Sequence, residues 1–180
     1  MIKLADLLKE EKQTYDYGCV MLYFSFPEME KIHTTIAPED IYTEEGDRTY
    51  GLEDEPHTTL LYGLHEEVTE QNIEEVLSKY EYGTCYVSNA SSFNNEKYDV
   101  LKFDVKGENL HETNTALKQF PFTTEYPKYH PHMTIAYLKP GKAKKYIAQL
   151  SGQEFELIPT HAVYSKSNGD QIKLVIKVNK

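Results

Sequence analysis

A short motif occurs twice in this chain, and each copy opens a run of apolar residues. The motif is a histidine, any residue, a threonine and an apolar residue, and its copies are His57-Thr58-Thr59-Leu60 and His132-Met133-Thr134-Ile135. Each copy leads into a run that is typical of a buried strand. Because side chains at positions i and i+2 of a strand point to the same face, each histidine should project beside the threonine of its own motif.

The chemistry of these side chains suits a phosphodiester. Of two imidazoles in one cleft, one can remove a proton while the other supplies one, and hydroxyls can donate hydrogen bonds to phosphate oxygens. One such tetrapeptide alone is short and common, and a threonine chosen for its β propensity would explain it. Two copies at matching places favour a catalytic role for His57, Thr59, His132 and Thr134.

The segments around the two motifs follow the same order. Each half is expected to hold a helix, the motif strand, a second helix and two further strands, and the motif histidines lie 75 residues apart (132 − 57 = 75). This pattern predicts a single bilobal α+β domain over residues 1–180, with lobes at about 19–105 and 109–178 and an amphipathic helix at 1–14. A pseudo-twofold axis between the lobes would place the motif strands on opposite walls of one central cleft.

Patterning along the chain predicts the remaining elements. Residues 37–55 contain few apolar side chains and indicate a long loop, of a kind that often serves as a lid. Thr69 is a predicted N-cap for the helix that follows it. The predicted strands are 19–26, 56–62, 84–91, 98–105, 131–138, 154–164 and 171–178, and the predicted helices are 27–36, one after Thr69, 109–120 and 142–150.

The charge balance narrows the choice of ligand. With 19 basic and 29 acidic residues the net charge is −10, which argues against binding to long DNA or RNA, while a small nucleotide in a local pocket remains compatible. No apolar run is long enough to cross a bilayer and the first residues do not resemble a signal peptide, so we expect no membrane partner and a cytoplasmic location. Cys19 and Cys85 lie in apolar runs and are expected to be core residues.

The remaining histidines and the aromatic residues complete the set of candidates. His57, His130 and His132 have no nearby cysteine or carboxylate that would complete a zinc site, so no metal ion is expected. Tryptophan is absent and tyrosine is abundant, with 15 residues. Aromatic rings can stack on nucleobases, and the candidates for substrate binding are Tyr23, Phe93, Tyr126 and Tyr129.

The paired motifs resemble those of the two-histidine (2H) phosphoesterases, over most of residues 19–178. The resemblance implies two mainly antiparallel sheets that flank a central cleft, with helices outside. It also implies a hydrolase that needs neither metal nor cofactor and acts as a phosphodiesterase on 2′,3′-cyclic phosphates, 2′,5′ bonds or cyclic nucleotides.

A closer resemblance lies in residues 55–69, which are similar to the anti-CBASS phosphodiesterases of phages. This resemblance implies a monomer in the host bacterial cytoplasm that opens 3′,5′ bonds of cyclic di- and trinucleotide immune signals, such as cyclic GMP-AMP, for immune evasion. The tryptophan that some relatives stack on a base has no counterpart here, which leaves Phe93 or a tyrosine for that role. Two alternatives remain: an RNA-processing 2′,3′-cyclic or 2′,5′ phosphodiesterase, and a non-catalytic sponge that holds a cyclic nucleotide.

Overall fold

Two four-stranded antiparallel sheets form the centre of the computed structural model, which describes residues 13–179. In the first sheet the strand order is β2 (His57–Leu64), β1 (Gly18–Phe24), β8 (Pro159–Ser165) and β9 (Gln171–Leu174). In the second the order is β6 (His132–Leu138), β5 (Asp99–Lys106), β4 (Cys85–Asn94) and β7 (Glu154–Leu157). A short parallel pair joins β3 (Glu81–Tyr82) to β10 (Lys177–Val178).

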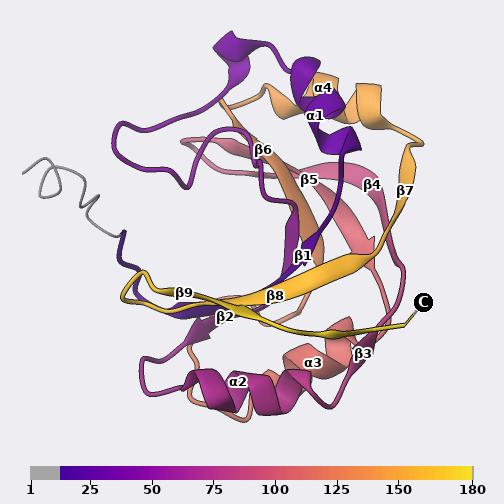
Figure 1. Ribbon diagram of the computed structural model, residues 1–180. Helices are drawn as coiled ribbons and strands as arrows, with labels where there is room; N and C mark the ends of the chain where they lie inside the picture. Colours follow the sequence, from indigo (N-terminus) through magenta and orange to yellow (C-terminus); the bar gives the residue numbers. More distant parts are fainter. Residues whose placement is uncertain (1–12, 180) are drawn as a thin grey trace, which may run out of the picture.

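The helices lie in two pairs, one on each side of the sheets (Figure 1). Helices α1 (Glu28–Thr34) and α4 (Ala143–Leu150) pack on the β6 sheet, whereas α3 (Leu110–Leu117) packs on β2 and against α2 (Glu70–Leu77). A 3₁₀ turn, η2, spans Pro38–Asp40. The predicted N-cap is confirmed, because the Thr69 hydroxyl accepts from the backbone N–H of Asn72 in a reciprocal capping box. The predicted helix 1–14 falls almost entirely outside the described residues, and residues 13 and 14 are not helical.

Both motif strands lie at an edge of their sheet, and these two edges face each other. Side chains of β2 and β6 such as Leu60, Leu64, Ile135 and Leu138 have no exposed surface and belong to one continuous core. Burying apolar side chains from both sheets in a common core fixes the sheets relative to each other. The motif strands therefore form the central seam of the molecule.

The sheets do not coincide with the predicted lobes 19–105 and 109–178. Strands β4 and β5, from the first predicted lobe, pair with β6 and β7, whereas β8 and β9 pair with β1. The predicted strand 154–164 is in fact two strands, since β7 ends at Leu157 and β8 begins at Pro159 in the other sheet. A proline cannot donate a ladder hydrogen bond and is tolerated at the first residue of a strand, which fits a change of sheet at this point.

Each motif strand has its free edge covered by the connection that precedes the opposite motif strand. Loop 37–55 lies along β6, where Tyr42 N donates to Tyr137 O (2.9 Å) and Tyr137 N donates to Gly51 O (2.8 Å). Residues 121–123 lie along β2, where Thr123 N donates to Gly63 O (2.9 Å). These bonds satisfy backbone groups that an uncovered edge would leave unpaired. The predicted loop at 37–55 is thus tied to the sheet edge by its backbone.

Candidate active site

Each motif strand carries a bulge at the apolar residue of its motif. In β2, Thr59 pairs with Met21 and Leu61 pairs with Val20, which leaves Leu60 as the extra residue. In β6, Thr134 pairs with Lys102 and Ala136 pairs with Leu101, so that Ile135 is extra. A bulge bends its strand and redirects the neighbouring side chains. The apolar residue of the motif therefore anchors the bend in the core, beside the threonine.

The carbonyl of each bulged residue is bound by a side chain from a helix. Asn114 Nδ2, on α3, donates to Leu60 O at 2.7 Å, and His33 Nε2, on α1, lies 2.9 Å from Ile135 O. Glu53 N also donates to Ile135 O, at 3.0 Å. Because a bulge removes a carbonyl from the regular ladder, these polar groups replace the missing partner. Neither Asn114 nor His33 was identified from the sequence, because they act through a bulge that the sequence does not reveal.

The imidazoles of the two motifs are held in the same way. His57 Nδ1 lies 2.8 Å from Glu55 O, and His132 Nδ1 lies 2.9 Å from His130 O. A carbonyl oxygen accepts only from a protonated nitrogen, so Nδ1 carries the proton in the neutral ring. In the part of the chain that the structure describes, neither Nε2 has a hydrogen-bond partner. Each ring therefore has one anchored nitrogen and one nitrogen available for proton transfer.

The strands that carry the two motifs are in contact, and the charged groups around the two histidines differ. Burial lowers the pKa of His132 below its usual value, the bond to His130 O acts in the opposite direction, and the charges of Lys102 and His57 lower it further. Burial raises the pKa of the Glu53 carboxyl, and the charge of His57 acts against that rise. His132 thus has the cationic group of Lys102 near it, whereas His57 has the carboxyl group of Glu53 near it.

Tyr23, predicted to bind substrate, packs against His57. Its ring stacks on His57 from β2 and on His161 from β8, with ring centroids 5.2 and 5.0 Å apart. Because β2 and β8 flank β1, the tyrosine lies between two imidazoles, and its ring faces are taken by the protein itself. The adjacent hollow, of about 430 Å³, is lined by Tyr23, Phe24, Asp54, Glu55, Pro56, His161, Val163, Gln171 and Lys173.

Phe93, also predicted to bind substrate, lies beside His132. The two rings are nearly perpendicular at 83°, with centroids 5.2 Å apart, and 49% of the Phe93 surface is exposed. Lys102 Nζ lies 4.6 Å from the centroid of the same ring. The phenylalanine therefore forms an open aromatic wall at one half-site, and the buried lysine next to it was not identified from the sequence.

The two predicted tyrosines before β6 differ from each other. Tyr129 is largely buried, and its hydroxyl donates to Thr59 O at 2.8 Å. This bond links the segment before the second motif to the first motif. Tyr126 is 74% exposed and remains available to a ligand. Of the four predicted aromatic residues, Phe93 and Tyr126 offer open ring surface, whereas Tyr23 and Tyr129 position the motifs.

The two cysteines are free thiols, but only one is a core residue. Cys85 is fully buried, as expected. Cys19 lies on β1 with its thiol 4.0 Å from the Thr59 hydroxyl, and burial raises the pKa of this thiol to about 12. Cys19 is therefore a neutral neighbour of the first motif's threonine.

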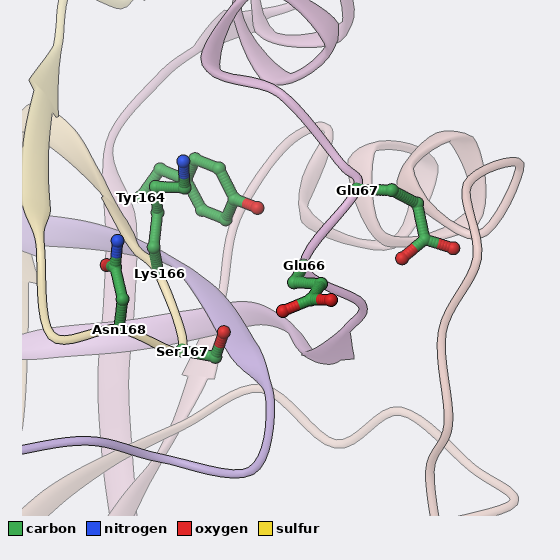
Figure 2. Close-up of a pocket in the computed structure, with 6 residues that line it drawn as sticks. All are labelled: Glu66, Glu67, Tyr164, Lys166, Ser167 and Asn168. Carbon is green, nitrogen blue, oxygen red and sulfur yellow. The ribbon is translucent and has the colours of Figure 1, made fainter.

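A second hollow, of about 390 Å³, lies away from the motifs. Figure 2 shows its lining, which comes from the turn after β2 and from the end of β8 with the turn that follows: Glu66, Glu67, Tyr164, Lys166, Ser167 and Asn168. The Tyr164 hydroxyl donates to Val68 O at 2.7 Å and so serves the fold. With neither histidine among its lining residues, this hollow lacks the acid–base groups of the motif seam.

Residues 13–179 hold neither a cluster of metal ligands nor a membrane-spanning helix. No three His, Cys, Asp or Glu side chains there are grouped so as to hold a metal ion. None of the helices in that part of the chain is long and apolar enough to cross a membrane.

Comparisons with known proteins identify the fold. No family model and no curated protein sequence matches the chain. Among solved structures, Kluyveromyces marxianus Usb1 with uridine monophosphate is 9% identical at a TM-score of 0.53, covering 89% of this chain and 98% of Usb1. A protein described as a phosphoesterase is 13% identical at a TM-score of 0.46, covering 88% of this chain and 95% of that chain. The α+β arrangement of antiparallel sheets and flanking helices expected from the paired motifs is confirmed, and the chain shares its fold with Usb1.

Proposed function

We propose that this chain is a 2H phosphoesterase in activity as well as in fold, and that it opens the 3′,5′ bonds of cyclic di- and trinucleotides without a metal ion. The observation that carries the proposal is the paired anchoring of His57 and His132, each with Nδ1 bound to a carbonyl two residues earlier. General acid–base catalysis requires one group that removes a proton and another that supplies one, and two imidazoles with Nε2 available can fill these roles.

The proposed reaction uses the substrate's own ribose as the nucleophile. One imidazole takes the proton of the 2′-hydroxyl while the 2′-oxygen forms a bond to the adjacent 3′-phosphorus. The other imidazole gives its proton to the 5′-oxygen as the P–O5′ bond breaks. The products are a 5′-hydroxyl and a 2′,3′-cyclic phosphate, with Thr59 and Thr134 donating to the non-bridging oxygens.

The preference for a small cyclic substrate follows from charge. A net charge of −10 opposes the counterion release on which binding of long nucleic acids depends. Phe93, Tyr126 and the hollow beside His57 provide surface for one or two nucleosides. Destruction of such signals fits the proposed role in evading bacterial CBASS defence, in the host cytoplasm.

One observation favours a second candidate, an RNA-processing phosphodiesterase. The structure of Usb1 that shares this fold was solved with uridine monophosphate. Under this candidate the same His/Thr pairs would act on an RNA end that carries a 2′,3′-cyclic phosphate or a 2′,5′ bond.

The deciding experiment offers both substrate classes to the purified protein with EDTA present. We expect 3′,3′-cyclic GMP-AMP to be opened, and we expect His57→Ala and His132→Ala each to abolish turnover. His111→Ala serves as the control, since this histidine is exposed and lies outside the motifs. Equal cleavage of a 2′-deoxy analogue would contradict the mechanism.

The other outcomes separate the alternatives. Action on an RNA 2′,3′-cyclic phosphate end alone would replace the cyclic-dinucleotide proposal with RNA processing. Tight binding without turnover, unchanged in the double variant His57→Ala/His132→Ala, would identify a sponge. Activity that EDTA removes and added metal restores would overturn the metal-free reaction.

A further inference from the structure

A buried lysine lies beside the second motif. Lys102 is on β5 directly opposite Thr134, and its neighbour two residues on, Asp104, is opposite His132. Because directly paired residues of adjacent strands project from the same face, the four side chains share the face that carries the motif. Only 7% of the Lys102 surface is exposed. A charged side chain at this depth requires specific partners, because losing water is costly for an ammonium group.

The ammonium group of Lys102 is held on several sides. Nζ donates to Ser91 Oγ at 2.8 Å and to Asp104 Oδ1 at 3.2 Å, and it lies over the Phe93 ring. Asn89 Nδ2 donates to the other carboxylate oxygen of Asp104 at 2.7 Å. An ammonium has three N–H donors, and these contacts use two of them. One donor of a well-fixed cation is therefore left for a ligand.

The matching position of the first half-site shows that the fold does not need this charge. There, Met21 on β1 pairs with Thr59, as Lys102 pairs with Thr134. Both motifs form the same bulge, and in both the histidine Nδ1 binds a backbone carbonyl. This holds whether the threonine lies opposite methionine or lysine. The lysine is thus an addition to one half-site, and a function in binding explains why the cost of burying it is tolerated.

We propose that Lys102 is the phosphate-binding cation of this site. Its remaining N–H donates to a non-bridging oxygen of the scissile phosphate, next to the hydroxyl of Thr134. As the 2′-oxygen attacks, negative charge builds on these oxygens, and a fixed ammonium in a water-poor site stabilises it. This inference rests on the proposed function and adds a third anchor to the His and Thr pairs.

The same charge distinguishes the two histidines. The charged and titratable groups that act on His132 are Lys102, His57 and Asp104, and the two cationic groups favour its neutral form. A neutral imidazole accepts a proton, so the burial of His132 together with the charge of Lys102 beside it favours His132 as the base.

The test replaces Lys102 with methionine, the residue at the equivalent position of the first half-site, Met21. Lys102→Met removes the charge and keeps a long side chain, whereas Lys102→Arg keeps the charge. Lys106→Met is the control, because this lysine is exposed on the same strand. We expect Lys102→Met to weaken the binding of inorganic phosphate, followed by ³¹P NMR, at least about tenfold, and to lower kcat about 10²–10³-fold. Lys102→Arg should retain most of the phosphate affinity.

A second readout follows the imidazole itself. In Lys102→Met, the pKa of His132, measured by NMR of its ring protons, should rise, and the acidic limb of the pH–rate profile should move up with it. Because loss of the charge raises this pKa whether or not Lys102 binds phosphate, the phosphate affinity decides the role of the lysine. A melting temperature kept within a few degrees shows that the variant is folded, and Lys102→Gln provides a second neutral variant.

The outcomes distinguish this inference from the proposed function. If the chain binds phosphate through Lys102 but cleaves no phosphodiester, the role of Lys102 in phosphate binding is supported and the proposed enzymatic function is wrong. If turnover and phosphate binding are equal in wild type and Lys102→Met, Lys102 does not bind the phosphate, and the proposed enzymatic function is unaffected. Absence of phosphate binding to the wild type would also overturn the inference.

Discussion

Each motif histidine follows a proline, and this proline explains how the ring is oriented. Pro56 precedes His57, and Pro131 precedes His132. A proline keeps the residue before it extended, which directs that residue's carbonyl to the imidazole Nδ1. The proline carbonyls are used as well, since Phe24 N donates to Pro56 O at 2.9 Å and Val105 N to Pro131 O at 3.0 Å. The repeated unit therefore begins one residue before each histidine, as Pro-His-x-Thr.

The middle residue of the first motif yields a stability prediction. Thr58 has no exposed surface, and within residues 13–179 its hydroxyl has no hydrogen-bond partner. Valine has nearly the same shape and no hydroxyl, so Thr58→Val should raise the free energy of unfolding by about 1 kcal/mol. For a chain of this size the melting temperature would rise by about 2–4 °C.

Calorimetry of Thr58→Val beside Thr59→Val provides the check. Thr59 faces the site, so its change should leave stability nearly unaltered and reduce turnover. A fall in the melting temperature of Thr58→Val would mean that its hydroxyl has a partner, such as an internal water.

The sequence indicated the two His/Thr pairs as candidates and missed the residues whose place depends on strand register. His57, Thr59, His132 and Thr134 were recognisable because they repeat at a fixed spacing. Lys102 gives no such signal, since its place beside Thr134 depends on how β5 pairs with a strand about 30 residues later. The only local hint was a lysine placed between the apolar residues Leu101 and Phe103. Pairing across strands is a tertiary property, and periodicity does not encode it.

At the scale of elements, most predicted strands and helices are confirmed, and the errors fall where the chain changes sheet. The predicted strands 56–62 and 131–138 are close to the observed β2 and β6. The predicted strand 154–164 is wrong, because the chain leaves one sheet at Leu157 and enters the other at Pro159. An apolar run shows that a segment is extended and buried, but it does not identify the neighbours of the strand.

The connection over the edge of β2 predicts an unusual sensitivity at a glycine. Gly63 has a φ of +110°, and a Cβ built there would lie 1.9 Å from Thr123 O. Gly63→Ala must therefore strain its backbone and push residues 121–123 off the strand. Gly141, with a φ of +80° and nothing within 4 Å of a Cβ, is the matched control. We expect Gly141→Ala to cost about 1 kcal/mol and Gly63→Ala about 1–3 kcal/mol more.

Urea unfolding of the two variants measures this difference. Hydrogen exchange at the Thr123 amide, which donates to Gly63 O, should accelerate in Gly63→Ala alone. Equal costs for the two variants would show that left-handed backbone strain accounts for the whole effect and that the close approach contributes nothing.

At the scale of the whole molecule, the two halves of the sequence are interleaved. Each sheet joins strands from before and after the predicted boundary near residue 107, and each motif strand has its edge covered by a connection from the other half. Asn114, after the boundary, binds Leu60 O, and His33, before it, lies against Ile135 O. The repeat in the sequence correctly predicted a twofold relation between motifs, but the sheets exchange strands across it.

Interleaving predicts that neither half of the sequence folds alone. A fragment of residues 13–107 would keep the pairs β1–β2 and β4–β5 but lose β8 from the side of β1 and β6 from the side of β5. The complementary fragment, residues 108–179, would keep the pair β8–β9, but its β6 and β7 would lack β5 and β4, the strands that join them. Each fragment would expose core side chains and unpaired strand edges, so circular dichroism should show no cooperative melting for either, while the whole chain melts in one transition. A single fragment with its own sharp transition would show that a lobe is autonomous, in which case the two motifs would be joined by docking of finished lobes and not by a shared core.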